Sequence, residues 1–340
     1  MAVSAGSSQV FLRKRDGLFK ERPAIYILIL LGAFVVSYLY KLRVDGIFGC
    51  QANGYSSDSY LSYCGAKNYG IYDQGAFWFG LEPAAEQSAT RADVLFLGDS
   101  RTQFAFSTAA TAQWFSSASA SFYLLGFLNY ENSIFTRALL HKLKPKPKAY
   151  VINIADFFQT SETPEAKFIM NDADAQARYE VKHLWQLIHE PICNKLARIC
   201  GHNLALFRSR QTGAFESETY IAVMTRGFKG RNRLVSYDQQ IDEREINEAV
   251  GIGRIFLSEL PVKSECIILT AIPTVGTKLG LTNAIAGGLG KILADPEHLD
   301  SLQTFDGSHL DQASAERWSE AFFKTAGPQI QKCLAMHTSR

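Results

Sequence analysis

Beyond residue 91 the chain alternates short apolar runs with amphipathic segments. Four apolar runs are continuous and end at turn residues, as in strands buried on both faces: 93–97, 121–125, 150–154 and 266–272. Helical spacing of apolar positions predicts helices at 107–115, 132–143, 241–260 and 313–323. Strands that alternate with helices predict an α/β fold of three layers, α/β/α, in which helices cover both faces of a mainly parallel sheet.

The carboxyl ends of the strands are the expected location of a functional site, because chemistry in such folds gathers there. The residues at these ends are Ser100, Gly126, Asn153 to Asp156, and Thr274. We therefore expect the site at this edge of the sheet.

The N-terminal region holds a longer apolar run. Residues 24–40 include no charged side chain, and a helix of that length just crosses a hydrocarbon core of about 30 Å. Tyrosines lie near both ends of the run, and Lys41 and Arg43 follow it, as suits a membrane interface. The pattern predicts a transmembrane helix at 23–42.

Charge predicts the orientation of this helix. Residues 1–22 carry five basic and two acidic side chains, so the positive-inside rule predicts a cytoplasmic tail and an exported C-terminal part. A cleaved signal peptide is the alternative, but no small-x-small cleavage site follows the run promptly. Residues 47–50 make a poor lipoprotein cleavage box, because Phe48 is bulky. We expect an uncleaved signal anchor.

The exported part is expected to contain two regions. Residues 43–90 are rich in Gly, Ser, Tyr and Asn, which indicates a linker or cap. Residues 91–340 form the α/β domain, with an insertion at about 160–240 that is too long for a simple loop. Four aromatic residues of the cap form either a sugar-stacking platform over the site or ordinary packing: Tyr72, Phe77, Trp78 and Phe79.

Composition and charge are those of a globular protein. The 340 residues are 47% hydrophobic and 20% charged, and the formal net charge is +2. Outside the tail, acidic and basic residues nearly balance. A neutral body lacks the basic face that binding to phosphate backbones needs, which argues against a nucleic-acid partner.

All six cysteines follow the membrane run, which predicts disulfides in an oxidising compartment. Proximity along the chain favours two pairs and leaves a third: Cys50–Cys64, Cys193–Cys200 and Cys266–Cys333. For Cys266 the alternative is a buried thiol. The cysteine and histidine spacings do not resemble a zinc site, so neither a metal nor a cofactor is predicted.

Two short motifs carry the candidate chemistry. Gly98-Asp99-Ser100 places a serine directly after a buried strand, with its hydroxyl at the sheet edge. Asp306 precedes His309 by three residues, a spacing that lets the carboxylate orient the imidazole. Such a histidine can accept a proton from a serine hydroxyl. Taken singly, the first motif is more often a turn or helix cap and the second a surface turn.

Together the motifs resemble the SGNH/GDSL hydrolase superfamily, over roughly residues 93–332. The resemblance implies an SGNH/flavodoxin-like sheet, with Ser100 as nucleophile, His309 as general base and acid, and Asp306 as its orienting partner. It also implies an oxyanion hole formed by the backbone N–H groups of Ser100 and Gly126.

The third block of that superfamily, Gly-x-Asn-Asp, is altered in this chain. Residues 153–156 read Asn-Ile-Ala-Asp, so Ala155 stands where the family has an oxyanion-binding asparagine. Asn153 and Asn129 are the candidates to replace that donor. Three residues are weaker candidates for substrate contacts: Arg101, Asn129 and Asp156. For Arg101 the alternative is a surface ion pair.

The resemblance extends to a function. Exported, single-pass SGNH proteins are similar to esterases and O-acetyltransferases of bacterial exopolysaccharides and wall polymers. They also resemble the D-alanyl transfer proteins of teichoic acid synthesis, which work beside a multipass membrane acyltransferase. It implies an anchor in the bacterial inner membrane, a periplasmic domain, and acyl transfer or ester hydrolysis on a polysaccharide through an acyl-Ser100 intermediate. The alternative is a non-catalytic glycan-binding or assembly partner with the same fold, which the altered third block favours.

Overall fold

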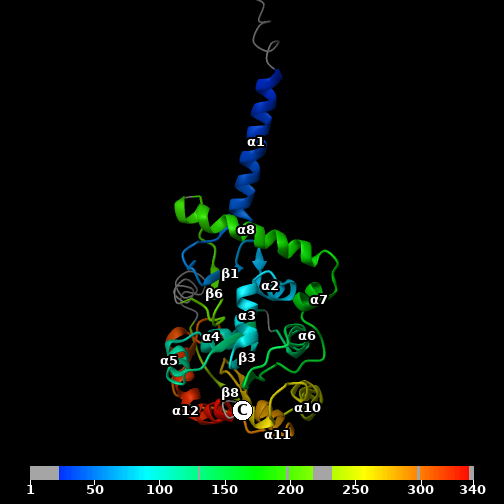
Figure 1. Cartoon of the computed structure of the whole chain (residues 1–340), viewed down its shortest axis with the longest axis vertical. Helices are drawn as coiled ribbons and strands as arrows, with labels where there is room; N and C mark the ends of the chain where they lie inside the picture. The colour runs from blue at the N-terminus through cyan, green and yellow to red at the C-terminus, as the bar shows by residue number, and fades with distance from the viewer. Residues whose placement is uncertain (1–22, 129–130, 197–198, 217–231, 297–298, 337–340) are drawn as a thin grey trace, which may run out of the picture.

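The computed structural model describes most of the chain outside the N-terminal tail, namely residues 23–128, 131–196, 199–216, 232–296 and 299–336. The tail expected at 1–22 lies outside these residues. An apolar helix, α1 (Pro23–Val44), projects away from the rest of the protein and has no buried residue (Figure 1). By its length and composition this helix is able to cross a membrane.

The centre of the fold is a parallel sheet of four strands, as the apolar runs predict. The strands are β3 (Val94–Asp99), β4 (Phe122–Phe127), β5 (Ala149–Asn153) and β9 (Ile267–Thr270), in the spatial order β4-β3-β5-β9. Successive side chains alternate between two hydrophobic clusters: Leu95 and Leu97 belong to one, and Val94 and Phe96 to the other. Both faces of the sheet are therefore buried, which explains why its strands are continuously apolar.

Helices contribute to both clusters. The first cluster takes side chains from α6 (Ser133–Leu143), α10 (Glu243–Ser258) and α11 (Leu279–Gly288). The second takes them from α4 (Ser100–Phe106), α5 (Ala109–Ser117) and α12 (Gln312–Met336). Two helices thus follow β3 where one was expected at 107–115, and α12 runs well past its expected end.

A second sheet joins the expected cap to the expected insertion. In this sheet β1 (Ser59–Cys64) pairs antiparallel with both β2 (Gly70–Ile71) and β6 (Ala205–Ser209). Among the described residues, this part also contains the α-helices α2 (Asp73–Phe79), α3 (Pro83–Arg91), α7 (Pro164–Asn171) and α8 (Ala175–Lys195). A fully buried ion pair of 2.8 Å between Arg208 and Asp73 ties the two segments together.

The aromatic residues of α2 and its neighbours pack inside the protein. Tyr72 and Phe77 are completely buried, and Trp78 and Phe79 pack against the first hydrophobic cluster. Ordinary packing, and not a sugar-stacking platform, is therefore their role in the structure.

The six cysteines form the three expected pairs, the two that chain proximity favours and the one that remains: Cys50–Cys64, Cys193–Cys200 and Cys266–Cys333. The first disulfide joins Cys50, near the start of the cap, to Cys64 at the end of β1. The third ties the end of α12 to the residue before β9. Short strands complete the described fold: β7 (Arg233–Leu234), β8 (Tyr237–Asp238), β10 (Thr277–Lys278) and β11 (Gln303–Thr304).

Candidate active site

Ser100 begins helix α4 directly after β3, at the carboxyl edge of the sheet. The helix starts here because Asp99 caps it: the Asp99 carboxylate accepts the backbone N–H of Arg101 at 2.9 Å. Gly98 has φ +152°, and a Cβ at this position would lie 2.2 Å from Thr102 Oγ1. Only glycine permits so tight a turn from strand to helix, and that turn places the Ser100 hydroxyl beyond the sheet.

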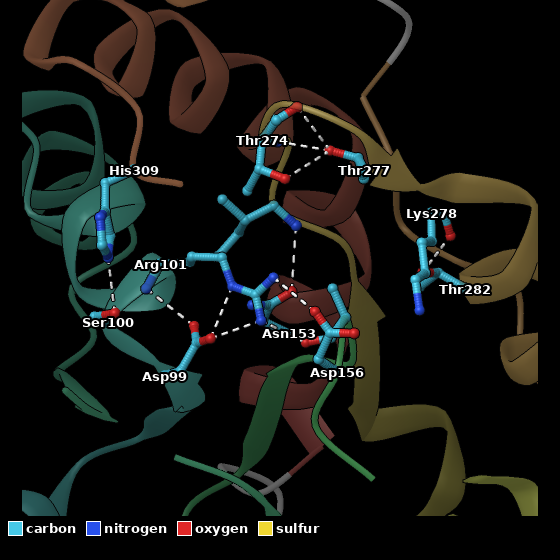
Figure 2. Close-up of polar contacts among 12 residues, drawn as sticks. Asp99, Ser100, Arg101, Asn153, Asp156, Thr274, Thr277, Lys278, Thr282 and His309 are labelled. Atoms are coloured by element: carbon cyan, nitrogen blue, oxygen red, sulfur yellow. Dashed lines mark hydrogen bonds and ion pairs between the residues drawn. The ribbon is translucent and has the colours of Figure 1, made fainter. Parts of the chain in front are cut away.

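His309 and Asp306 reach Ser100 from the turn before α12. His309 Nε2 lies 2.8 Å from Ser100 Oγ, and His309 Nδ1 lies 2.7 Å from Asp306 Oδ2. Figure 2 shows the imidazole of His309 pointing at the Ser100 hydroxyl. The two motifs singled out in the sequence therefore meet in one hydrogen-bonded chain.

The turn itself holds the Asp306 carboxylate in place. Asp306 Oδ1 accepts the backbone N–H groups of Ser308 and His309, each at 2.8 Å. Burial alone would raise the pKa of Asp306, but the hydrogen bond and charge of His309, with those two N–H groups, hold this pKa below its ordinary value. Asp306 is thus an anion at neutral pH, which keeps the His309 proton on Nδ1 and leaves Nε2 free to accept from Ser100.

Two phenylalanines fix the plane of the His309 ring. Phe305 stacks on it, with centroids 5.5 Å apart and planes at 14°, and Phe104 contacts it at 4.8 Å. Phe104 lies on α4 one turn after Ser100, and Phe305 directly precedes Asp306. Neither phenylalanine was among the residues predicted for the site, although their positions next to the two motifs could have indicated a contact with the His309 ring.

Arg101 is buried, which rules out the surface ion pair that was the alternative for it. It is only 6% exposed, and its guanidinium contacts Asp99 at 2.6 Å, Asp156 at 3.1 Å and the Ala155 carbonyl oxygen at 2.8 Å. Burial lowers the pKa of Arg101, but the charges of Asp99 and Asp156 outweigh this and raise it. Arg101 therefore forms a buried ion pair, not a surface one, and its charge is already balanced by protein carboxylates. It joins the end of β3 to the loop after β5 (Figure 2).

Gly126, a candidate oxyanion donor, lies near the end of β4. The Gly126 carbonyl oxygen accepts from Gln103 Nε2 at 2.7 Å, and a Cβ on Gly126 would lie 2.6 Å from the Asp99 carbonyl oxygen. A side chain there would therefore strike the end of β3, next to Ser100. Asn129 lies outside the described residues.

Asn153 is almost fully buried at the end of β5. Its Oδ1 accepts the backbone N–H of Ile272 at 3.2 Å, while Nδ2 has no hydrogen-bond partner among the residues that the structure describes. Asn153 therefore ties β5 to the loop after β9 and keeps one spare donor. The oxyanion roles of Ser100, Gly126 and Asn153 stay predictions.

A pocket of about 470 Å³ opens beside the triad on the Asp306 side. Its wall includes the turn residues Asp306 to Ser308, the loop after β9 around Thr274, and the ion-paired Arg101 and Asp156. Further charged side chains, which sequence analysis missed, also line it: Arg233, Glu245, Glu248 and Lys278. Arg233 belongs to β7, Glu245 and Glu248 to α10, and Lys278 to β10, so no single local pattern marks all four.

Comparisons of the chain with models of protein families, with curated proteins and with solved structures gave no match. Any function assigned to this chain therefore rests on its motifs and on the geometry of Ser100, His309 and Asp306.

Proposed function

We propose that this protein is a serine-dependent ester hydrolase or O-acyltransferase of the SGNH type, acting through an acyl-Ser100 intermediate. The observation that carries the proposal is the continuous hydrogen-bonded chain from Ser100 through His309 to Asp306. This arrangement of nucleophile, base and orienting carboxylate is what acyl transfer requires.

The proposed reaction has two halves, and in each half His309 accepts a proton and then returns it. His309 Nε2 takes the proton of the Ser100 hydroxyl as Oγ bonds to the acyl carbon of the donor ester. The imidazolium, stabilised by the Asp306 carboxylate, then returns that proton to the departing alcohol. In the second half, His309 removes a proton from water or a sugar hydroxyl, whose oxygen takes the acyl group, and Ser100 recovers its proton. Water gives hydrolysis, and a sugar hydroxyl gives transfer.

The sheet supports assignment to the SGNH type. When the four parallel strands are numbered in chain order, they lie side by side as 2-1-3-4. This order agrees with a flavodoxin-like sheet. Each hydrophobic cluster contains residues from its own set of helices, which agrees with three layers. The strand order reverses between β3 and β5, and ligands of such folds bind at this switch point. Ser100 follows β3, and the loop held by Arg101 follows β5.

The substrate we propose is an acylated polysaccharide outside the cytoplasm. The pocket beside the triad is lined by several charged side chains, of which Lys278 and Glu245 pair at 3.2 Å. Polar walls of this kind suit a hydroxyl-rich chain better than an apolar one. A multipass membrane acyltransferase would be the natural source of the acyl group.

We place the protein in the inner membrane of a bacterium, with α1 as anchor and the folded domain in the periplasm. The apolar helix and the three disulfides support this placement. Alkaline phosphatase fused to the C-terminus should be active in cells, because that enzyme needs export to fold. An inactive fusion in a stably expressed protein would contradict the orientation.

A non-catalytic, glycan-binding or assembly role is the second candidate. The observation that favours it is Ala155 in place of an oxyanion-binding asparagine, with its carbonyl oxygen already engaged by Arg101.

Hydrolysis of p-nitrophenyl acetate by the full chain and by Ser100→Ala separates the two functions. The catalytic proposal expects turnover that the substitution abolishes. Equal rates in both proteins would favour the binding role. Adding an oligosaccharide acceptor then tells transfer from hydrolysis, because only a transferase yields acylated sugar.

A further inference from the structure

Helix α8 presents an apolar stripe on its outer side. Tyr179, Gln186 and His189 face the protein and are buried. On the opposite side, four large apolar side chains are exposed to between 36% and 61%: Val181, Leu184, Leu187 and Ile188. Because positions 181, 184 and 188 follow helical spacing, these residues form one stripe along the helix. A surface helix in water ordinarily turns polar residues outward, so this face is unsuited to solvent.

Two more large apolar side chains are exposed just after the helix. Leu196 and Ile199, which follow α8, are 54% and 43% exposed. An exposed apolar strip of this length on a folded domain marks a surface that something apolar covers.

The position of α8 identifies what covers it. A cavity at the base of α1 is lined by Tyr38, Lys41 and Leu42 of α1 and by residues of α8 that include Val181 and Trp185. Figure 1 shows α8 lying across the end of α1, on the side of the domain from which α1 projects. If α1 crosses a bilayer, α8 lies parallel to the bilayer surface, at the level where α1 leaves it.

The residues around the stripe suit a lipid interface. Trp185 is half-buried beside the end of α1, and Tyr38 lies in the last part of α1; aromatic rings of this kind favour the headgroup region. Lys41 and Arg178 line the same cavity and are exposed, where they can reach lipid phosphates.

We propose that α8 is an interfacial helix whose exposed stripe, residues Val181, Leu184, Leu187 and Ile188, rests in the outer headgroup region of the bilayer that α1 crosses. The proposal rests on α1 being the membrane anchor. Two attachments, one spanning and one lying flat, stop the domain from tilting about α1. The candidate active site is then held at a fixed height above the membrane, with its pocket in one orientation.

Tryptophan substitutions and brominated lipids test the proposal in the full chain, reconstituted one copy per nanodisc. Three variants report on three places: Leu184→Trp in the stripe, Phe34→Trp in α1, and Ile255→Trp on α10. Ile255 is a matched control, because it is 55% exposed, close to the 57% of Leu184, and α10 lies at the far end of the domain from α1 (Figure 1). The spectrum of the parent protein is subtracted to isolate each added tryptophan, and thermal unfolding confirms that each variant is folded.

The proposal expects bromines near the glycerol end of the acyl chains to quench Leu184→Trp strongly, with a blue-shifted emission. Phe34→Trp should respond most to bromines deep in the bilayer, and Ile255→Trp should not respond. Quenching at Phe34→Trp with none at Leu184→Trp overturns the α8 proposal alone. The exposed stripe of α8 would then be a surface for a protein partner and not for lipid. Absence of quenching at Phe34→Trp overturns the anchor itself.

Discussion

The hydroxyl of Ser100 and the imidazole of His309 lie 2.8 Å apart although 209 residues separate them in the chain. Ser100 is placed by the end of a central strand, and His309 by the turn that leads into the last helix. The contact therefore depends on the whole α/β domain being folded. Phe104, on the helix that Ser100 begins, also contacts the His309 ring, so nucleophile and base share one rigid support.

Asp306→Asn should lower kcat for ester substrates by about 10⁴-fold, as loss of the carboxylate does in a triad of this kind. The amide oxygen can still accept the N–H groups of Ser308 and His309, so the turn should persist. The amide N–H₂ would face His309 Nδ1 and force the ring proton onto Nε2, where it blocks acceptance from Ser100. Steady-state kinetics with p-nitrophenyl acetate measure the loss, and an unchanged melting temperature shows that folding is intact. Activity within tenfold of the parent would contradict the role given to Asp306.

Arg101→Ala should destabilise the protein by about 3–5 kcal/mol, because it leaves the buried Asp99 carboxylate without a counter-charge. Asp156→Asn is the matched comparison, because asparagine removes the charge and tolerates the left-handed backbone of this position, φ +56°. The Asp156 side chain is 46% exposed, and its loss should cost below about 1 kcal/mol. Urea unfolding in detergent gives both values. Similar small effects for the two variants would show that the Asp99–Arg101 pair does not organise this edge of the sheet.

Gly126→Ala should cost about 1–3 kcal/mol and reduce activity, because the new methyl would press on the Asp99 carbonyl oxygen, 2.6 Å away. Because Asp99 directly precedes Ser100, the strain should displace the nucleophile, and this displacement is the expected cause of the lower activity. Gly251→Ala on α10 is the control: nothing lies within 4 Å of its Cβ, and alanine should stabilise the helix by about 0.5–1 kcal/mol. Thermal unfolding and esterase assays compare the pair. An active, fully stable Gly126→Ala protein would show that β4 can move away from the Asp99 end of β3 at little cost.

Glu131 should make stability fall as pH rises. This residue is 1% exposed and accepts the backbone N–H of Asn132 at 2.9 Å. Burial raises the pKa of Glu131 from 4.5 to about 7. Between these values the folded protein keeps a proton that the unfolded chain has released, so the free energy of unfolding declines by roughly 3 kcal/mol across that window.

Glu131→Gln tests this by removing the titration. Gln74, which hydrogen-bonds to Glu131, has an amide oxygen without a partner among the described residues, so its amide can rotate to accept from the new side chain. Urea unfolding at pH 5 and pH 8 should show a smaller decline for the variant than for the parent, and a more stable variant at pH 8. Equal declines would mean that Glu131 does not keep its proton in the folded state.

Much of the fold and the core of the site was predictable, for identifiable reasons. The runs around Leu95, Leu125 and Ile152 hold three or four successive apolar residues because their strands are buried on both faces. The two motifs stand at strand and helix boundaries, which local pattern reveals. By contrast, β1 pairs with β6 across more than 140 residues, with a register shift between Leu61 and Tyr63. A short, irregular strand of this kind leaves no clear period in the sequence.

The side chains that surround the triad were harder to predict. The ion pair of Arg101 with Asp156 forms only once β3 and β5 are paired. The pocket residues Arg233 and Lys278 come from separate short strands, β7 and β10. Periodicity predicts which face of an element is buried, but not which distant element covers it.

The most direct test of the central claim is covalent labelling of the folded, full chain with a fluorophosphonate, followed by peptide mass spectrometry. The serine oxygen displaces fluoride from phosphorus, and His309 accepts the serine proton. We predict a single adduct on the peptide that contains Ser100. The adduct should be lost in His309→Ala, because the Ser100 hydroxyl of that variant has no base to accept its proton. Unlabelled Ser100 in a protein that melts cooperatively, or equal labelling without His309, would contradict the account.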